Sequence, residues 1–499
     1  MRILARSILS ILLIFQVVAC SKTPPEVNSA IHAAPAQNEL PPEEDIKPIQ
    51  PEFTGRLPEA GPGGDLAPHD GMALAELVDV ALTNSPQTRV AWAQARAAAA
   101  GWGTSRSEYY PTIAGEVDSA IGDVRQAIFQ GGQSYVAVGV TLDYLLLDFG
   151  GREARVRAAK EALIAANWSH DQAIQDVLRD VPQAYYNYLG DKAMVIAARK
   201  NLEDANTTLR STEARRESGV STIADVLQAR SSAQQAQADL ASAKGDAKIA
   251  KGALAQAVGW QANAPYDVAD EPSRLPIDKI SKGVDDLVEE AKYKRPDIGA
   301  MQAQVRQSEA EVEDARAKPF PTLSATGNFQ YQKYRSTDAR AAYGGLTLKI
   351  PLFAGFSMRN ALKQAQAELD AARAQLAAKE DTVIKEVWDA YYNFSTAKEQ
   401  YRAYNSLLVS ARESYAVSLE RYRNGAADIT ELLNAQNTLA SARSQLIGSR
   451  MAVYSQYAEL LHAVGDQVGG PQRQQIAYQD ADEVEVEVVE EVVEEADGD

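Results

Sequence analysis

The sequence is poor in the residues on which enzymes and metal sites depend, with one cysteine and four histidines in 499 residues. The single cysteine, Cys20, excludes a disulfide framework and a cysteine-ligated zinc site. The histidines are scattered, without the spaced pair that a metal site or a catalytic triad needs. A glycine-rich phosphate loop and a nucleophile elbow are also missing. We therefore expect no enzyme, no cofactor and no metal site.

An excess of basic residues is missing as well. Lys and Arg total 50 against 68 Asp and Glu, which gives a net charge of −18. This balance argues against a nucleic-acid partner, because phosphates are bound by a basic face. Eleven of the acidic residues lie in 480–499, where no Lys or Arg occurs. Repulsion between these like charges predicts that the acidic tail, 469–499, is disordered.

The N-terminus indicates export. The apolar run 8–19 is too short for a transmembrane helix but has the length of a signal-peptide core. It ends at Ala19-Cys20-Ser21, which resembles a bacterial lipoprotein signal, in which cleavage precedes a cysteine that is then lipidated. The resemblance implies a signal peptide over 1–19, a lipid anchor at Cys20 and sorting to the outer membrane. An ordinary signal peptide with an incidental cysteine is the alternative.

The segment behind the anchor is rich in proline. Residues 21–70 hold ten of the 21 prolines and show no helical periodicity, so we expect 20–70 to be the anchor and an extended leash. No later segment has 18 consecutive apolar residues, and the sequence therefore predicts no transmembrane helix.

The body of the chain contains an internal sequence repeat. Tyr185-Tyr186-Asn187-Tyr188 recurs 206 residues later as Tyr391-Tyr392-Asn393-Phe394. The same offset relates further pairs: Gly219 and Gly425, Leu227 and Leu433, Val258-Gly259 and Val464-Gly465. Two further pairs are separated by 210 residues: Pro86 and Pro296, and Pro111 and Pro321. The chain is therefore a tandem duplication of 71–265 and 283–468, joined by a connector over 266–282.

Each copy contains two segments in which apolar residues alternate with small or polar ones. The apolar positions are Ile113 and Val117; Val136, Val138, Val140, Leu142 and Tyr144; Leu323, Ala325, Gly327, Phe329 and Tyr331; and Leu346, Leu348, Ile350 and Leu352. This period of two predicts four strands of about ten residues, each apolar on one face. The strands of a half-buried soluble sheet show the same alternation of apolar and polar residues. The signal for sorting to the outer membrane favours the strands of a transmembrane barrel instead.

The number of strands predicts the number of chains. An eight-stranded barrel would be filled by side chains, and one chain supplies only four strands. Three chains supply twelve, the smallest multiple of four with room for water. The sequence predicts a trimer, provided that the strands cross lipid and the barrel conducts.

Long helices follow each strand pair. The segment Gly150–Ser218 would reach about 100 Å as one helix. A seven-residue apolar spacing is carried by Leu362, Leu369, Leu376 and Val383. This spacing favours closely packed coiled-coil helices over an ordinary globular bundle. Gly219 and Gly425 each interrupt a helical pattern, because glycine permits the φ > 0 turn that ends a helix.

The predicted fold class is therefore mainly α with a transmembrane β-barrel. Each repeat consists of a helix, a β-hairpin and a long coiled-coil helical hairpin. Because the helices of a hairpin leave the strands and return to them, the glycine turns form a tip opposite the membrane.

The order and duplication of these signals resemble the TolC family of outer-membrane efflux proteins over roughly 71–468. The resemblance is carried by the two tip motifs, 218–230 and 421–436, and by Pro351-Leu352-Phe353-Ala354-Gly355. It implies a homotrimer that shares a 12-stranded barrel in the outer membrane and continues as an α-helical tunnel through the periplasm. It also implies two partners, a periplasmic adaptor (membrane fusion) protein and an inner-membrane pump.

In that family the tip turns dock the adaptor. Carried over to this sequence, the docking residues are Gly219, Val220 and Ser221 in the first copy, with Gly425 and Ala426 in the second. The alternative is that the glycines only cap helices.

The same family closes its tunnel with acidic residues just past the second tip turn. Glu431 and Asn434 take these positions, and Asp225 and Tyr422 match the partners of the closing latch. Asn434 is uncharged and Ala427 stands where the family has an arginine, so an identical latch cannot form. Three copies of Glu431 around a narrow axis would repel one another and attract cations. A solvated helix face is the alternative for Glu431.

The resemblance implies the exit duct of a tripartite efflux system, which conducts drugs or metal ions passively. Type I protein secretion through the same kind of duct is an alternative that the sequence does not separate. A periplasmic coiled-coil scaffold without a barrel is the second alternative.

Overall fold

The computed structural model describes residues 68–120, 135–269, 275–276, 280, 282–334 and 338–466, which all belong to one unit. The predictions for the signal peptide 1–19, for Cys20, for the acidic tail 469–499 and for nearly all of the leash lie outside the described residues.

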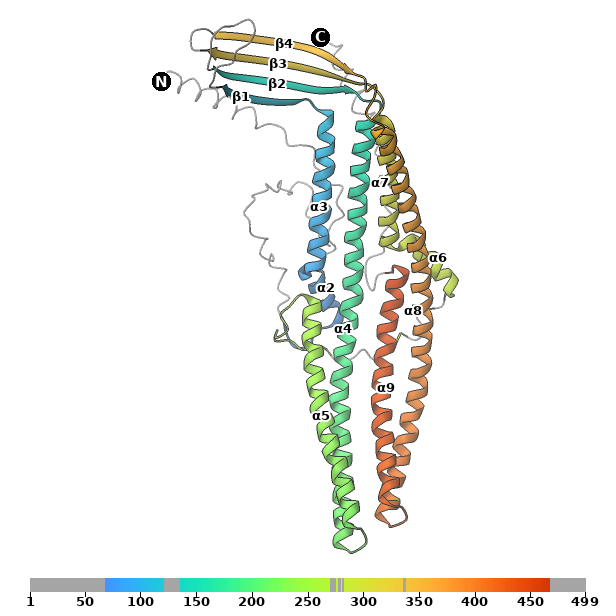
Figure 1. Cartoon of the computed structure of the whole chain (residues 1–499). Helices are drawn as coiled ribbons and strands as arrows, with labels where there is room; N and C mark the ends of the chain where they lie inside the picture. Colours follow the sequence, from blue (N-terminus) through green and yellow to red (C-terminus); the bar gives the residue numbers. More distant parts are fainter. Residues whose placement is uncertain are drawn as a thin grey trace, which may run out of the picture. The chain divides into compact units, whose positions relative to one another are not determined.

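The two repeats have the same order of helices, and equivalent helices differ in length by at most one residue (Figure 1). The first contains α2 (Leu74–Asn84), α3 (Pro86–Arg106), α4 (Gly151–Glu217) and α5 (Ile223–Val258). The second contains α6 (Val284–Lys294), α7 (Pro296–Ala317), α8 (Ser357–Arg423) and α9 (Ile429–Val464). The helices α4 and α8 have 67 residues each, and α5 and α9 have 36 each. Every residue of these four helices therefore has an equivalent 206 positions away.

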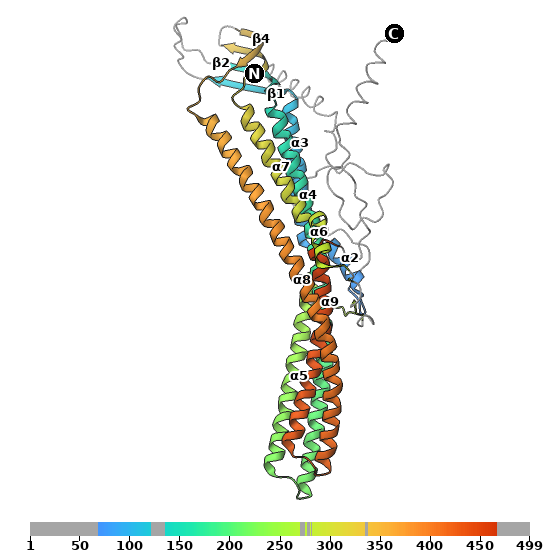
Figure 2. The ribbon, with the colours of Figure 1, turned by 90° about the vertical axis from the view of Figure 1, so that its right-hand side faces the viewer.

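The helices lie in a row. Towards the tips the order is α5, α4, α9, α8, and towards the sheet it is α3, α4, α7, α8, with each helix packed on its neighbour (Figure 1). Seen from the side, the hairpins α4–α5 and α8–α9 end at the same end of the molecule, with the turn of α4–α5 reaching slightly further (Figure 2). We call the contact of α4 with α7 and α9 the repeat junction, because it joins the first repeat to the second. Within the described residues, no helix is both long and apolar enough to cross a membrane.

The four predicted strands form one antiparallel sheet in the order β1-β2-β3-β4. They are β1 (Thr112–Ala120), β2 (Tyr135–Leu147), β3 (Thr322–Tyr334) and β4 (Asp338–Lys349). The central pair, β2 and β3, joins the two repeats across more than 170 residues of sequence. The fourth strand ends before Ile350 and Leu352, which were predicted to belong to it, because Pro351 lacks the N–H that the ladder needs.

The register places the apolar positions of all four strands on one face. Val117 pairs with Val138, Val140 with Phe329, and Leu323 with Leu348, and partners in an antiparallel ladder point to the same side. This face is open: Val117 is 72% exposed, Leu346 69% and Leu348 60%. The opposite face carries Thr, Ser, Asn and Gln from β3 and the acidic side chains of β1.

An ion network around the buried Arg295 holds the second repeat together at the level of α6. The side chain of Arg295 is only 4% exposed and contacts Asp297 and Glu386 at 2.6 Å. It also donates to the carbonyl of Ala463 at the end of α9, at 3.2 Å. Lys379 of α8 completes the network by contacting Asp297 at 2.7 Å. Charges buried in this way must all be paired, because each is removed from water.

The network predicts a dependence of stability on pH. Burial raises the pKa of Asp297, but hydrogen bonds from Arg295 and Lys379 outweigh burial and lower the pKa to about 2. The pKa of Asp297 is lower in the folded state than in the unfolded state, so the ionised carboxylate stabilises the fold by on the order of 2 kcal/mol. This stabilisation is present above about pH 4 and is lost as pH falls towards 2. We expect Asp297→Asn to be less stable than wild type at pH 7 and equally stable near pH 2.

Urea unfolding between pH 2 and 7, followed by circular dichroism in detergent, measures this difference. Asp389→Asn is the control, because Asp389 lies on α8 in an exposed i,i+4 pair with Lys385. A stability difference for Asp297→Asn that stays constant over this pH range would contradict the assignment.

Candidate functional site at the helical tips

Both helical hairpins turn through a glycine in the left-handed conformation. Gly219 has φ 78° and Gly425 has φ 76°, values that residues with a Cβ rarely adopt. The following amide donates back across the turn in both copies, from Val220 to the Arg215 carbonyl at 2.9 Å and from Ala426 to the Arg421 carbonyl at 2.8 Å. The two turns therefore have one geometry.

The residues predicted to dock a partner lie on the surface of these turns. Gly219, Val220, Gly425 and Ala426 are exposed, and Ser221 is half-buried. Val220 is 62% exposed, which leaves an apolar side chain in solvent at the end of the first hairpin. The structure thus places all five residues together at one end of the described chain.

Asp225 caps its own helix. Its carboxylate accepts from the Thr222 amide and from the Ser221 hydroxyl, both at 2.8 Å, while the Thr222 hydroxyl accepts from the Asp225 amide at 3.2 Å. The hydrogen bond from the Thr222 amide, and then that from Ser221, lower the pKa of Asp225. This capping box fixes the start of α5. Asp225 is therefore linked to Tyr422 through Ser221, whose hydroxyl lies 3.5 Å from the Tyr422 hydroxyl.

Tyr422 joins the two hairpins. Its hydroxyl lies 3.2 Å from the Thr212 hydroxyl and 3.5 Å from that of Ser221, and its side chain is buried. The guanidinium of Arg215 stacks 4.7 Å from the centre of the Tyr422 ring and donates to the Tyr422 carbonyl at 2.6 Å. Tyr422 of the second repeat is thus held by three residues of the first. Arg215 and Thr212 were missed by the sequence analysis, although Arg215 is the repeat equivalent of Arg421.

Glu431 is paired within its own hairpin. Arg421 donates to the Glu431 carboxylate at 2.5 Å and to the Ala426 carbonyl at 3.1 Å. Both side chains are 40% exposed or more, so this ion pair contributes about 0–1 kcal/mol. Asn434 lies one turn further along α9 and is exposed. The sequence analysis did not anticipate the pair of Glu431 with Arg421, because the two side chains come close only when the chain turns at Gly425.

The tip contains donors and acceptors arranged to hold two helix ends together. Among the residues that the structure describes, no group of three or more His, Cys, Asp or Glu is placed to hold a metal ion. The network consists of one aromatic ring, two arginines and short polar side chains, and its contacts can be broken and remade without covalent chemistry.

Comparisons with known proteins identify the family and the fold of the chain. The family model described as outer membrane efflux protein matches residues 77–260 and 287–466. Protein CyaE of Bordetella pertussis is 29% identical over 403 residues, which cover 80% of this chain and 85% of that protein. Toluene efflux pump outer membrane protein TtgC of Pseudomonas putida is 25% identical over 413 residues, 79% and 83% of the two chains. The solved structure of the outer-membrane channel OprN has a TM-score of 0.70 at 22% identity and covers 80% of this chain and 91% of its own.

Tyr422→Phe tests the joint between the hairpins. The variant keeps the ring under Arg215 but loses the hydroxyl that contacts Thr212 and Ser221. Because one such hydrogen bond contributes about 1 kcal/mol, we expect amide exchange over 212–225 to become about fivefold faster. Hydrogen-exchange mass spectrometry measures this rate, with Tyr293→Phe as the control, because the Tyr293 side chain of α6 is exposed. Unchanged protection at the tip would mean that the hydroxyl does not join the hairpins.

Proposed function

The chain belongs to the outer membrane efflux protein family, and we propose that it is the outer-membrane exit duct of a tripartite efflux system. In this proposal an inner-membrane pump expels small molecules, drugs or metal ions, through a periplasmic adaptor into the duct. The duct conducts them passively, and its opening is a change in helix packing at the tips.

The open apolar face of the sheet carries this proposal. A face with Val117, Phe329 and Leu348 at 53% exposure or more would be costly in water but is stable against lipid. Its two edge strands, β1 and β4, offer unpaired backbone groups in a single chain. Three copies placed edge to edge would close a barrel of twelve strands, satisfy these edges and enclose the polar face as a lumen.

The helices supply the second half of the duct. At 1.5 Å per residue, 67 residues extend about 100 Å from the sheet, a length that suits a tunnel reaching across the periplasm. The exposed tip residues Gly219, Val220, Ser221, Gly425 and Ala426 would then meet the adaptor. Lipidation of Cys20, which lies outside the described residues, would anchor each chain in the outer membrane.

The proposed gate lies at the same end. Glu431 would face the axis with Asn434, and Tyr422 with Asp225 would hold the closed arrangement. Three copies of Glu431 around an axis repel one another, and the exposed ion pair with Arg421 offsets only part of this repulsion. The closed tip would therefore be stable by a small margin, which contacts with an adaptor can reverse.

Conductance in planar lipid bilayers tests the duct. We expect the purified chain to form trimers that conduct ions and prefer cations. Glu431→Gln should change the single-channel conductance and reduce the cation preference, because it removes three carboxylates from the constriction. Glu399→Gln, which removes an exposed carboxylate from the shaft of α8, should leave both unchanged. A wild-type chain that is monomeric and silent in the bilayer would overturn the duct and favour a scaffold without a barrel.

Deletion of the gene tests the class of cargo. One relative is named as the outer-membrane protein of a toluene efflux pump, which favours small organic molecules. We expect the deletion strain to become at least severalfold more sensitive to lipophilic drugs or solvents, and complementation to restore resistance. Unchanged sensitivity together with loss of one secreted polypeptide would favour type I protein secretion instead.

A further inference from the structure

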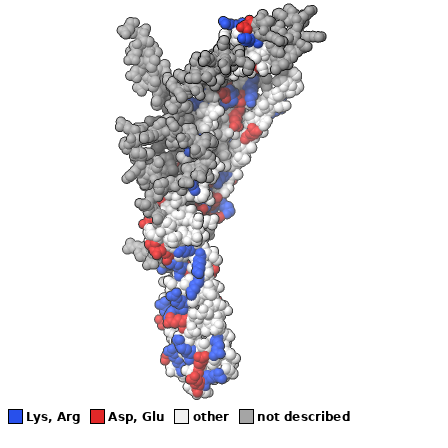
Figure 3. Space-filling view, turned by 90° about the vertical axis from the view of Figure 1, so that its left-hand side faces the viewer, with Lys and Arg blue, Asp and Glu red and all other residues white. Residues whose placement is uncertain are grey.

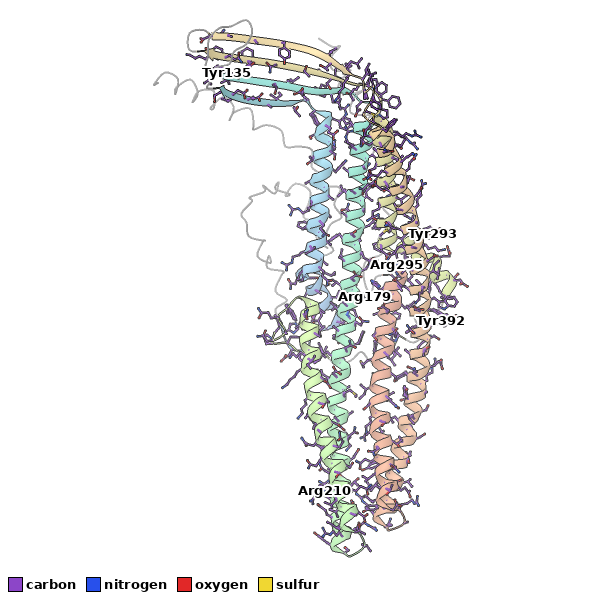
Figure 4. All side chains as sticks on the ribbon, in the orientation of Figure 1. Tyr135, Arg179, Arg210, Tyr293, Arg295 and Tyr392 are labelled. Carbon is purple, nitrogen blue, oxygen red and sulfur yellow. The ribbon has the colours of Figure 1, made fainter. Side chains whose placement is uncertain are left out.

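Two cationic side chains lie on the apolar face of the sheet, at the end that is distant from the helices. Figure 4 places Tyr135, the first residue of β2, at this far end, and Lys333 of β3 pairs with the next residue, Val136. Arg340 of β4 pairs with Tyr331 of β3, two residues before Lys333. Both cations therefore share a face with the apolar residues, although charge at the centre of a lipid-facing surface is costly.

Charge is sorted between the two faces towards the far end. The polar face carries Glu116 and Asp118 of β1, and the apolar face carries Lys333 and Arg340. Figure 3 looks at this end and shows basic side chains beside acidic ones at the top, where the sheet ends. In the proposed barrel the polar face lines the lumen, so these acids face water and the cations face lipid. A charged rim that served solubility alone would need no such sorting.

The two cations are not neutralised by the carboxylate next to them. Asp338 is the Cα partner of Lys333, but its carboxylate accepts from the Tyr331 hydroxyl at 2.8 Å. The Arg340 guanidinium lies 5.8 Å from the centre of the Tyr331 ring. Within the described part of the chain, neither Lys333 nor Arg340 forms an ion pair. Both are exposed, so their donors are available to an anion from outside the chain.

Cations beside the near end of the sheet, where the helices begin, are paired. Arg155 contacts Glu108 at 2.6 Å and Asp314 at 2.8 Å, and Lys318 contacts Asp314 at 3.3 Å. Exposed apolar side chains such as Phe353, which is 77% exposed, also lie at this end. Lys333 and Arg340 thus differ from Arg155 and Lys318 in having no carboxylate of their own among the described residues.

The position of the two cations along the strands matches the level of lipid headgroups. Leu323 and Leu348 form the first apolar pair at the near end, and Lys333 comes ten residues after Leu323. At about 3.4 Å per residue and a strand tilt of about 40°, ten residues cover about 26 Å along the membrane normal. The apolar band of a transmembrane barrel is about 25 Å tall. Lys333 therefore lies where the hydrocarbon ends, and the long side chain of Arg340 can reach the same level.

A phosphate group that belongs to a lipid fits this arrangement. The fork of an arginine binds two phosphate oxygens, and a lysine adds a point charge. Tyr331 has the amphipathic ring that is typical of the membrane interface. Nearer the helices on the same face, Phe329 is 53% and Leu346 69% exposed, which offers contact to acyl chains. The surface therefore combines sites for an anion and for hydrocarbon, which favours an amphiphile over a soluble anion.

We propose that Lys333 and Arg340 bind a phosphate group of lipid A in the outer leaflet of the outer membrane, while its acyl chains cover the apolar face beside Tyr331. The proposal rests on the proposed function, which puts the helices on the periplasmic side, so that the far end of the sheet meets the outer leaflet. Asp338 lies next to the bound phosphate and repels it, which limits the affinity.

Native mass spectrometry of the full, lipidated chain in detergent, titrated with lipid, tests the site. We expect lipid A to bind about tenfold more tightly than lipid A from which both phosphates have been removed. Lys333→Gln with Arg340→Gln should weaken the binding of lipid A by about tenfold and leave that of the dephosphorylated lipid unchanged, because it removes charge but keeps the apolar face. Inorganic phosphate in excess should not displace lipid A, since it has no acyl chains.

Two further variants separate this site from the general charge of the protein. Lys349→Gln removes an exposed cation from the polar face at the near end of β4 and should leave the binding of lipid A unchanged. Asp338→Asn removes the repelling carboxylate but keeps an oxygen that can accept from the Tyr331 hydroxyl. It should strengthen the binding of lipid A severalfold, which damage to the fold would not do.

Three results would overturn the proposal: equal binding of lipid A and its dephosphorylated form, wild-type affinity of the variant that lacks both cations, or displacement of lipid A by inorganic phosphate. Conductance of the wild-type chain, measured on the same preparation, separates this failure from a failure of the duct. A chain that conducts without phosphate-dependent binding loses the lipid site and keeps the duct. A chain that binds lipid A as expected but does not conduct keeps the lipid site and loses the duct.

Discussion

The packing of α4 against α7 and α9 is the constraint on which the rest of the structure depends. It brings two halves of the chain, each with its own hairpin of strands and its own hairpin of helices, into one row. Glycines at Gly190 and Gly299 make this packing possible, since a Cβ at either position would overlap the side chain that it faces. The pairing of β2 with β3 and the meeting of the two tips follow, because both lie at the ends of the same helices.

The strength of the contacts differs along this row in a way that suits a duct. At the level of α6, the buried Arg295 is paired with Asp297 and Glu386, and breaking such a pairing is costly. At the tips, the pair of Arg421 with Glu431 is exposed, and such a pair contributes little. A molecule built in this way can change its tips while its middle remains rigid. Movement would therefore be confined to the end at which a partner is proposed to bind.

Several features were predictable because they depend on local sequence. The alternation in 322–331 fixes which side chains share a face, and the register confirms this face. The glycines at 219 and 425 adopt the positive φ that their position in a broken helical pattern predicts. The network around Tyr422 was not predictable, because Thr212, Ser221 and Arg215 reach it only through the packing of two hairpins about 200 residues apart. The pairing of Glu431 with Arg421 likewise depends on how sharply the chain reverses at Gly425.

The duplication, the four strands, the long helices and the turns between them can be read from the amino-acid order, because periodicity and glycine act over a few residues. The tertiary structure decided which equivalent faces are covered and which are open. Tyr186 and Tyr392 occupy the same place in the repeat, yet one is buried and the other is 46% exposed. Burial depends on what lies beside a helix, and only the arrangement of the row shows that α4 has a neighbour there and α8 has none within the described chain.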